Sequence, residues 1–130
     1  MERRLVPTRS PYAALAGYSR AVRVGEHVYV AGTAPIMEDD ADPPGDAYGQ
    51  AKRCFEIIVA ALAEVDAGPK DVVRTRVYLT DGAHWEGAGR AHGELFADVR
   101  PANTTVVVGA LLDPRWLMEI EVEAVVAEGR

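Results

Sequence analysis

Arg100–Ala124, which reads RPANTTVVVGALLDPRWLMEIEVEA, is the stretch that decides the fold. Its first part, Thr104–Leu111, is rich in β-branched residues and predicts a strand. An Asp113-Pro114 turn follows, and Leu117–Val126 then alternates between apolar residues and glutamates, which is typical of a strand with one buried face. The chain is therefore expected to end in two strands.

An earlier stretch, Gly17–Pro35, reads GYSRAVRVGEHVYVAGTAP and predicts a β-hairpin. Residues Ser19–Val24 alternate in polarity, Gly25-Glu26 supplies a short turn, and His27–Ala31 forms the second strand. The next segment, Thr33–Gly45, is rich in Pro, Asp and Gly and is expected to be a solvated loop.

Two helices are expected between these strands. Asp46 is a residue type that caps helix N-termini, and the helix that it begins should end before Gly68-Pro69. Apolar residues recur along it at helical spacing and form one face; they are Ala51, Cys54, Ile57, Ile58, Ala61, Leu62 and Val65. A second helix is expected over His84–Phe96.

A further strand, Val72–Leu79, lies between the two helices, which gives the order ββαβαββ. This order predicts an α+β sandwich, with a mixed β-sheet and both helices on one face. Alternation assigns Val73, Thr75, Val77 and Leu79 to one face of this strand, and Arg74, Arg76 and Tyr78 to the other. The second set, together with Glu119, Glu121 and Glu123, is either solvated or covered by a neighbouring subunit.

Length and charge limit the class of protein. A chain of 130 residues is expected to form a single domain, residues 1–130, and its net charge of −6 with only two lysines argues against nucleic-acid and membrane-surface partners. The single cysteine, Cys54, is interpreted as a core residue and fits a cytoplasmic protein. The three histidines lack the spacing of a zinc site, and no phosphate-binding loop is present, so no metal and no cofactor are expected.

His92 is the histidine that needs two interpretations. It shares a helical stripe with Trp85, Ala88 and Phe96, which favours a packed structural role. Its ordinary pKa near neutrality keeps an acid–base role open.

These segments together resemble the RidA/YjgF family. The resemblance rests on GYSRAVRVGEHVYVAGTAP, the amphipathic helix, DVVRTRVYLTD at Asp71–Asp81, RPANTTVVV and EIEVEA, in that order. It implies a chorismate mutase-like fold, a homotrimer, and small-molecule clefts between subunits in which reactive enamines or imines are hydrolysed. Some members carry the older names endoribonuclease or translation inhibitor, which fit this acidic chain poorly.

The resemblance also implies which residues form the cleft. Glu121 matches the glutamate that holds or activates the attacking water, and Tyr18 and Gly32 match residues that line the site. Asn103 stands where deaminating members carry an arginine that binds the substrate carboxylate, and Thr105 stands two residues further on. Trp85, His92 and Arg115 complete the set of expected substrate-binding residues; Arg115 is either a replacement charge or merely exposed.

Asn103 changes the expected chemistry, since an amide offers neither the charge nor the fork of a guanidinium. We therefore expect an enzyme that acts on an imine, an enamine or a related carbonyl metabolite, but not a standard 2-imino-acid deaminase. A non-catalytic protein that binds or senses a metabolite is the alternative. An endoribonuclease or translation inhibitor is a weaker one.

Overall fold

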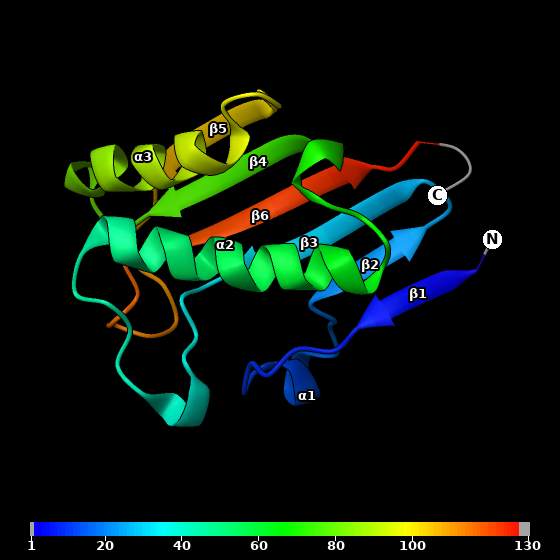
Figure 1. Ribbon diagram of the computed structural model, residues 1–130. Helices are drawn as coiled ribbons and strands as arrows, with labels where there is room; N and C mark the ends of the chain where they lie inside the picture. Colours follow the sequence, from blue (N-terminus) through cyan, green and yellow to red (C-terminus); the bar gives the residue numbers. More distant parts are fainter. Residues whose placement is uncertain (1, 128–130) are drawn as a thin grey trace.

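The computed structural model describes residues 2–127, which fold around one six-stranded mixed sheet (Figure 1). The strands follow the spatial order β1-β2-β3-β6-β4-β5, and only β4 and β5 run parallel among neighbouring pairs. Their bounds are β1 Arg3–Val6, β2 Ala21–Val24, β3 His27–Thr33, β4 Val72–Leu79, β5 Ala102–Val107 and β6 Met118–Val125.

Two long helices, α2 (Ala47–Glu64) and α3 (Trp85–Phe96), pack side by side on one face of this sheet (Figure 1). The expected α+β architecture is therefore confirmed. A four-residue helix, α1 (Ala13–Ala16), precedes β2, and short 3₁₀ turns cover Glu38–Asp40, Pro69–Asp71 and Gly82–His84. No helix within residues 2–127 has both the length and the apolar character needed to cross a bilayer.

Local sequence explains where these elements begin and turn. Gly25 has φ 61° in the turn that joins β2 to β3, a conformation that glycine adopts without the strain of a side chain. Asp46 is the N-cap residue of α2, as expected, although its side chain makes no capping hydrogen bond. Gly87 permits α3 to approach the start of α2, because a Cβ there would lie 2.8 Å from the backbone nitrogen of Tyr48.

The core lies between the sheet and the two helices. The α2 stripe contributes Ala51, Cys54, Ile58, Ala61 and Leu62, all buried as the spacing predicts. Burial raises the pKa of the Cys54 thiol, which agrees with a packing role. The inward side chains of β6 meet them from the sheet; they are Met118, Ile120, Val122 and Ala124.

Some details of the sheet differ from expectation. The sheet gains β1, a short, charged strand whose four residues give too little periodicity to be recognised in the sequence. The strand expected over Thr104–Leu111 is β5, which ends at Val107 because the chain then turns away into the connection to β6. Val73 is 48% exposed and not buried, because the register between β4 and β6 shifts between Val72 and Arg74.

The two loops before α2 and β6 are tied together. Arg115 forms salt bridges with Asp40, Asp42 and Asp113 at 2.8, 3.1 and 2.8 Å. The buried Gln50 side chain adds hydrogen bonds to the backbone of Arg115 and Leu117. The segment around Arg115 is thus held in place by its own acidic neighbours.

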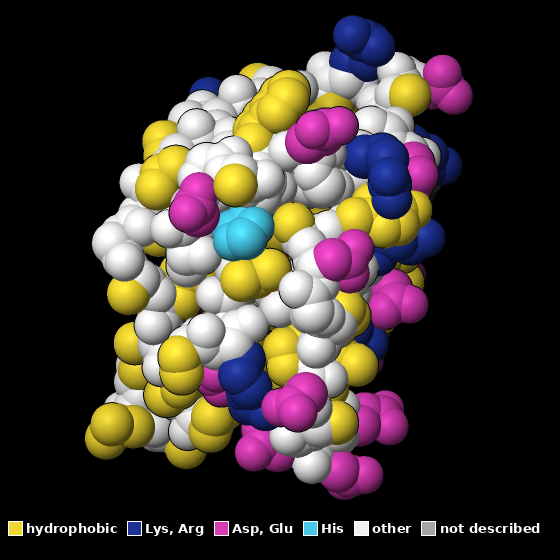
Figure 2. All heavy atoms as spheres, turned by 90° about the vertical axis from the view of Figure 1, so that its left-hand side faces the viewer, with side chains coloured by type: hydrophobic (Ala, Val, Ile, Leu, Met, Phe, Trp, Pro, Cys, Tyr) yellow, Lys and Arg dark blue, Asp and Glu magenta, His cyan; other side chains and the backbone are white. Residues whose placement is uncertain are grey.

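The second face of the sheet carries no helix of residues 2–127. Figure 2 views the end at which β6 begins: charged side chains gather on the side formed by the helices, and fewer of them are visible along the opposite edge. Leu5, Tyr29 and Val106, whose register positions assign them to this bare face, are 59%, 48% and 43% exposed. We call this surface the open face.

Candidate functional site

Glu121 lies in a row of charged residues on the open face. It stands opposite Arg76 in the register between β6 and β4, and a guanidinium nitrogen of Arg76 lies 3.7 Å from its carboxylate. The hydroxyl of Tyr78 donates a hydrogen bond to Glu121 Oε1, and this bond raises the pKa of the tyrosine. Glu123 extends the row and contacts Arg74 and Arg76. Glu121 is therefore held by a donor and a cation in a fixed orientation.

Glu119 is a second carboxyl on the open face, which the sequence analysis did not select. Partial burial raises its pKa, Arg20 opposes this shift, and Glu121 adds to it. A Cβ on Gly32 would lie 3.4 Å from Glu119 Oε1, so the glycine leaves room for this carboxyl. The alternation of β6 identifies the face of Glu119, but only the fold reveals how deeply it is buried.

Asn103 and Thr105 lie on β5, at the edge of the sheet. The Asn103 amide Nδ2 donates to Thr75 Oγ1 at 2.9 Å, and Thr105 Oγ1 donates to Asn103 Oδ1 at 3.0 Å. Thr75 is fully buried and lies 2.8 Å from His92 Nε2 on α3. A chain of hydrogen bonds therefore leads from the exposed β5 edge to the helix layer.

The hydrogen bonds of Thr75 favour an unprotonated Nε2 on His92. The Thr75 hydroxyl accepts from Asn103, so its own hydrogen is available for His92 Nε2, and in this arrangement Nε2 accepts. Burial lowers the pKa of His92 and favours the same neutral ring. The ring also packs against Phe96 and Phe55, with centroids 4.8 and 6.0 Å away. His92 therefore has a packed position with one defined polar contact.

The remaining expected residues are dispersed. Tyr18 lies between α1 and β2, and its hydroxyl hydrogen-bonds to Ser10 at 2.8 Å. Trp85 begins α3 and is 60% exposed. The guanidinium of Arg115 is already neutralised by three aspartates and extends toward them. Its charge is therefore occupied within the subunit.

Asn103 and Glu121, the two polar residues expected to contact the substrate most directly, lie on opposite faces of the sheet. Thr75 pairs in register with Asn103, and Arg76 pairs with Glu121. Successive residues of a strand point to opposite faces, so Asn103 belongs to the helix side and Glu121 to the open face. Within residues 2–127, no group of three or more His, Cys, Asp or Glu has the arrangement of a metal site.

Known proteins share this architecture. The family model described as Endoribonuclease L-PSP matches residues 8–126. The crystal structure of a member of the YjgF/YER057c/UK114 family from Mycobacterium tuberculosis has a TM-score of 0.87 and 38% identity; the match covers 96% of this chain and 100% of that one. The chain belongs to the RidA/YjgF family.

Other RidA/YjgF relatives match along nearly the whole chain. A Streptomyces coelicolor protein described as uncharacterized is 43% identical, over 93% of this chain and 90% of the relative. A RutC family protein from Pyrococcus abyssi is 33% identical, over 96% of this chain and 97% of the relative. Yeast Mmf1 has a TM-score of 0.81 at 27% identity, over 95% of this chain and 94% of that one. The expected family and fold are thus confirmed.

Proposed function

We propose that this protein is a small-molecule enzyme that hydrolyses a reactive imine, enamine or related carbonyl compound in clefts between subunits of a homotrimer. The observation that carries the proposal is the placement of Asn103 and Glu121 on opposite faces of one sheet. Two such groups can face one ligand when the open face of one copy meets the β5 edge of another. A cleft between subunits is the arrangement that joins them.

The open face supports such an assembly. Leu5, Tyr29 and Val106 expose large apolar areas there, beside arginines and glutamates that can set the register between chains. Covering this face would separate Glu121 from bulk solvent, leave room for the attacking water, and strengthen the interaction of Glu121 with a bound substrate. The same contact would bring a second subunit to each cleft.

The chemistry is an addition followed by an elimination. Glu121 accepts a proton from a water molecule as the water oxygen bonds to the imine carbon, which gives a carbinolamine. The carbon–nitrogen bond then breaks, the nitrogen leaves as ammonia after taking up protons, and a carbonyl compound remains. In this proposal Glu119, whose pKa is raised, gives a proton to the leaving nitrogen and is reprotonated by the carbinolamine hydroxyl as the carbonyl forms.

Asn103 and Thr105 bind the polar end of the substrate in this proposal, and Tyr18 and Gly32 line the cleft. Asn103 gives one hydrogen bond to Thr75 and accepts one from Thr105, which leaves one amide N–H and one lone pair for a ligand. A neutral amide binds a carboxylate less tightly than a guanidinium does. Substrates without a carboxylate are therefore favoured over 2-imino acids.

A second candidate function is the binding of a metabolite without turnover. The hydrogen bonds that Asn103 makes with Thr75 and Thr105 favour it, because the position serves as a rigid polar contact. The word endoribonuclease in the family description does not outweigh the net charge of −6, which disfavours RNA. The protein is expected to act in the cytoplasm.

Two measurements test the proposal. A neutral imine generated by an amine oxidase, and 2-iminopropionate generated by an amino-acid oxidase, are each followed with and without the protein. The expected result is faster loss of both, with the larger acceleration for the neutral imine. If the protein accelerates the loss of neither imine but binds a carbonyl metabolite saturably, the enzymatic proposal is wrong and the protein binds a metabolite without turnover. A solution mass of one 14.0 kDa chain would contradict the shared cleft.

A further inference from the structure

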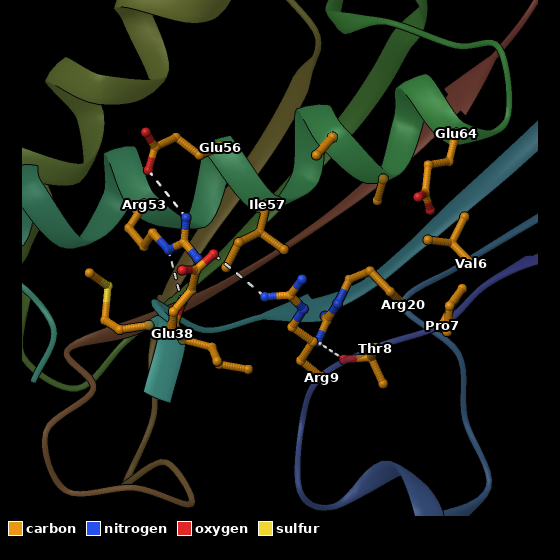
Figure 3. Close-up of a pocket in the computed structure, with 14 residues that line it drawn as sticks. Val6, Pro7, Thr8, Arg9, Arg20, Glu38, Arg53, Glu56, Ile57 and Glu64 are labelled. Carbon is orange, nitrogen blue, oxygen red and sulfur yellow. Dashed lines mark hydrogen bonds and ion pairs between the residues drawn. The ribbon is translucent and has the colours of Figure 1, made fainter. Parts of the chain in front are cut away.

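A separate pocket lies under α2, on the helix side of the molecule. Its volume is about 330 Å³, and it is bounded by α2, by the segment 6–9 that follows β1, and by residues 36–38 (Figure 3). None of Tyr18, Asn103 and Glu121 lines it. The pocket is thus distinct from the cleft proposed above.

Half of the residues that line the pocket are apolar, and most of the others are charged. Val6, Pro7 and Ile57 contribute from β1, the following segment and α2, and Ile36 and Met37 close the opposite side. Ile57 was expected in the core stripe of α2 but is only half-buried, because this pocket lies in front of it. Such a lining favours a ligand with an apolar body.

The arginines that line the pocket differ in whether they form a salt bridge. Arg9 pairs with Glu38 and Arg53 pairs with Glu56, both at 3.6 Å. Arg20 is only 4% exposed and forms no salt bridge with a carboxylate of residues 2–127. The charge of Glu119 acts on it from beyond salt-bridge distance, so this buried guanidinium has no direct ion pair in the described part of the chain and can still take a bound anion.

The hydrogen bonds of Arg20 go to neutral oxygens. Its two terminal nitrogens donate to Gly32 O at 3.0 Å, Thr33 Oγ1 at 2.9 Å and Thr8 Oγ1 at 2.8 Å. These three bonds fix the side chain, which Figure 3 shows extending beneath α2 toward Thr8 and Arg9. A guanidinium has five N–H groups, so two remain for a ligand. Burial also lowers the pKa of Arg20.

Glu64 restricts what kind of anion can bind. Figure 3 shows it above Val6, at the other end of the pocket from the Arg20 guanidinium, and no salt bridge of residues 2–127 neutralises it. A second carboxylate on the ligand would meet a like charge there.

We propose that this pocket is a binding site for a small monocarboxylic acid with an apolar body, whose carboxylate pairs with Arg20 near Arg9. The proposal does not depend on the function proposed above, since it uses a different cavity.

Hexanoate is the probe for this site, and hexanamide and adipate are its neutral and dicarboxylate controls. Binding is measured by titration with amide NMR, which also reports where each probe lies. Hexanoate is expected to bind with a dissociation constant of about a millimolar and to shift resonances around Arg20 and Ile57. Hexanamide and adipate should bind at least about tenfold more weakly.

Variants separate the pocket from the rest of the protein. Arg20→Gln should weaken hexanoate binding about tenfold or more. Ala60→Glu puts a carboxylate in the pocket lining and should abolish binding, whereas Ala63→Glu, on the same helix but outside that lining, should not. Glu121→Gln should also leave it unchanged. Ala60→Glu keeps the test decisive if Arg20→Gln does not fold.

Three outcomes would overturn the proposal. They are no saturable shift with hexanoate, equal binding of hexanamide, or shifts that follow Asn103 and Glu121 in place of the pocket. A negative result in this binding test would not bear on the function proposed for the cleft between subunits, because the hydrolysis of imines is measured separately.

Discussion

Asn103 and Glu121 are separated by one strand and lie on opposite sides of the sheet. Their register partners on β4 are the neighbouring residues Thr75 and Arg76, which point in opposite directions. One copy of the chain therefore carries two separate parts of the proposed site, Asn103 at the β5 edge and Glu121 on the open face.

Asn103→Arg should improve the use of substrates that carry a carboxylate. A guanidinium at the β5 edge adds a charge-assisted, bidentate contact. We expect the KM for 2-iminopropionate to fall about tenfold, with little change for a neutral imine. Steady-state kinetics with both substrates measure this, and Asn103→Gln is the neutral control. An equal change for the two substrates would contradict carboxylate binding at this position.

Glu121→Gln should lower kcat about 100-fold or more, because an amide cannot accept the proton of the attacking water. Glu123→Gln is the matched control. It shares the face and the Arg76 contact, but its hydrogen bond comes from Arg76 and not from Tyr78. Similar losses in the two variants would mean that the charged row as a whole, and not Glu121, supports turnover.

Glu119→Gln should change how stability depends on pH. Partial burial raises the pKa of Glu119, so the folded chain binds more protons than the unfolded chain just above the ordinary value of 4.5. Stability from this group is therefore lost as the pH rises through that range. Urea unfolding at several pH values should show a smaller loss in the variant, and exposed Glu26→Gln is the control. A slope equal to that of the unmodified protein would refute the burial effect.

His92 should have the opposite effect on how stability depends on pH. Burial lowers its pKa from the ordinary value of 6.5, so the unfolded chain takes up this proton first as the pH falls. Stability is complete above pH 6.5 and declines as the pH falls through the folded-state pKa. His92→Gln should reduce this decline, whereas His27→Gln, whose side chain is exposed at the start of β3, should not. Nitrogen NMR of the ring should show an unprotonated Nε2; a proton there would reverse the assigned hydrogen-bond direction.

Tyr29→Glu should disrupt assembly. Tyr29 stands opposite Glu123 on the open face, so a carboxylate there adds like charge to a surface proposed to be covered. Light scattering should report a shift from three chains toward one. Leu15→Glu, on the exposed short helix α1, is the control and should keep the original mass. An unchanged mass for Tyr29→Glu would move the interface away from this face.

Much of the fold follows from the sequence alone. Alternation in Leu117–Val126 predicted which residues of β6 are buried, and helical spacing predicted the core face of α2. These patterns are local, since each depends on the period of one element. Val73 is the counterexample: it fits the alternation of β4, but a register shift against β6 exposes it. Such a shift depends on a partner strand far away in the sequence.

The sequence by itself determined the family, the order of the elements and the identity of Asn103 and Glu121 as candidates, because residue types and periods are local properties. Only the tertiary structure decided that these two residues lie on opposite faces, that Arg115 is neutralised by three aspartates, and that Arg20 and Glu119 are buried. Burial and pairing depend on which distant segments pack together. The long-range contacts of the sheet and of α2 therefore determined the electrostatic environment of every candidate residue.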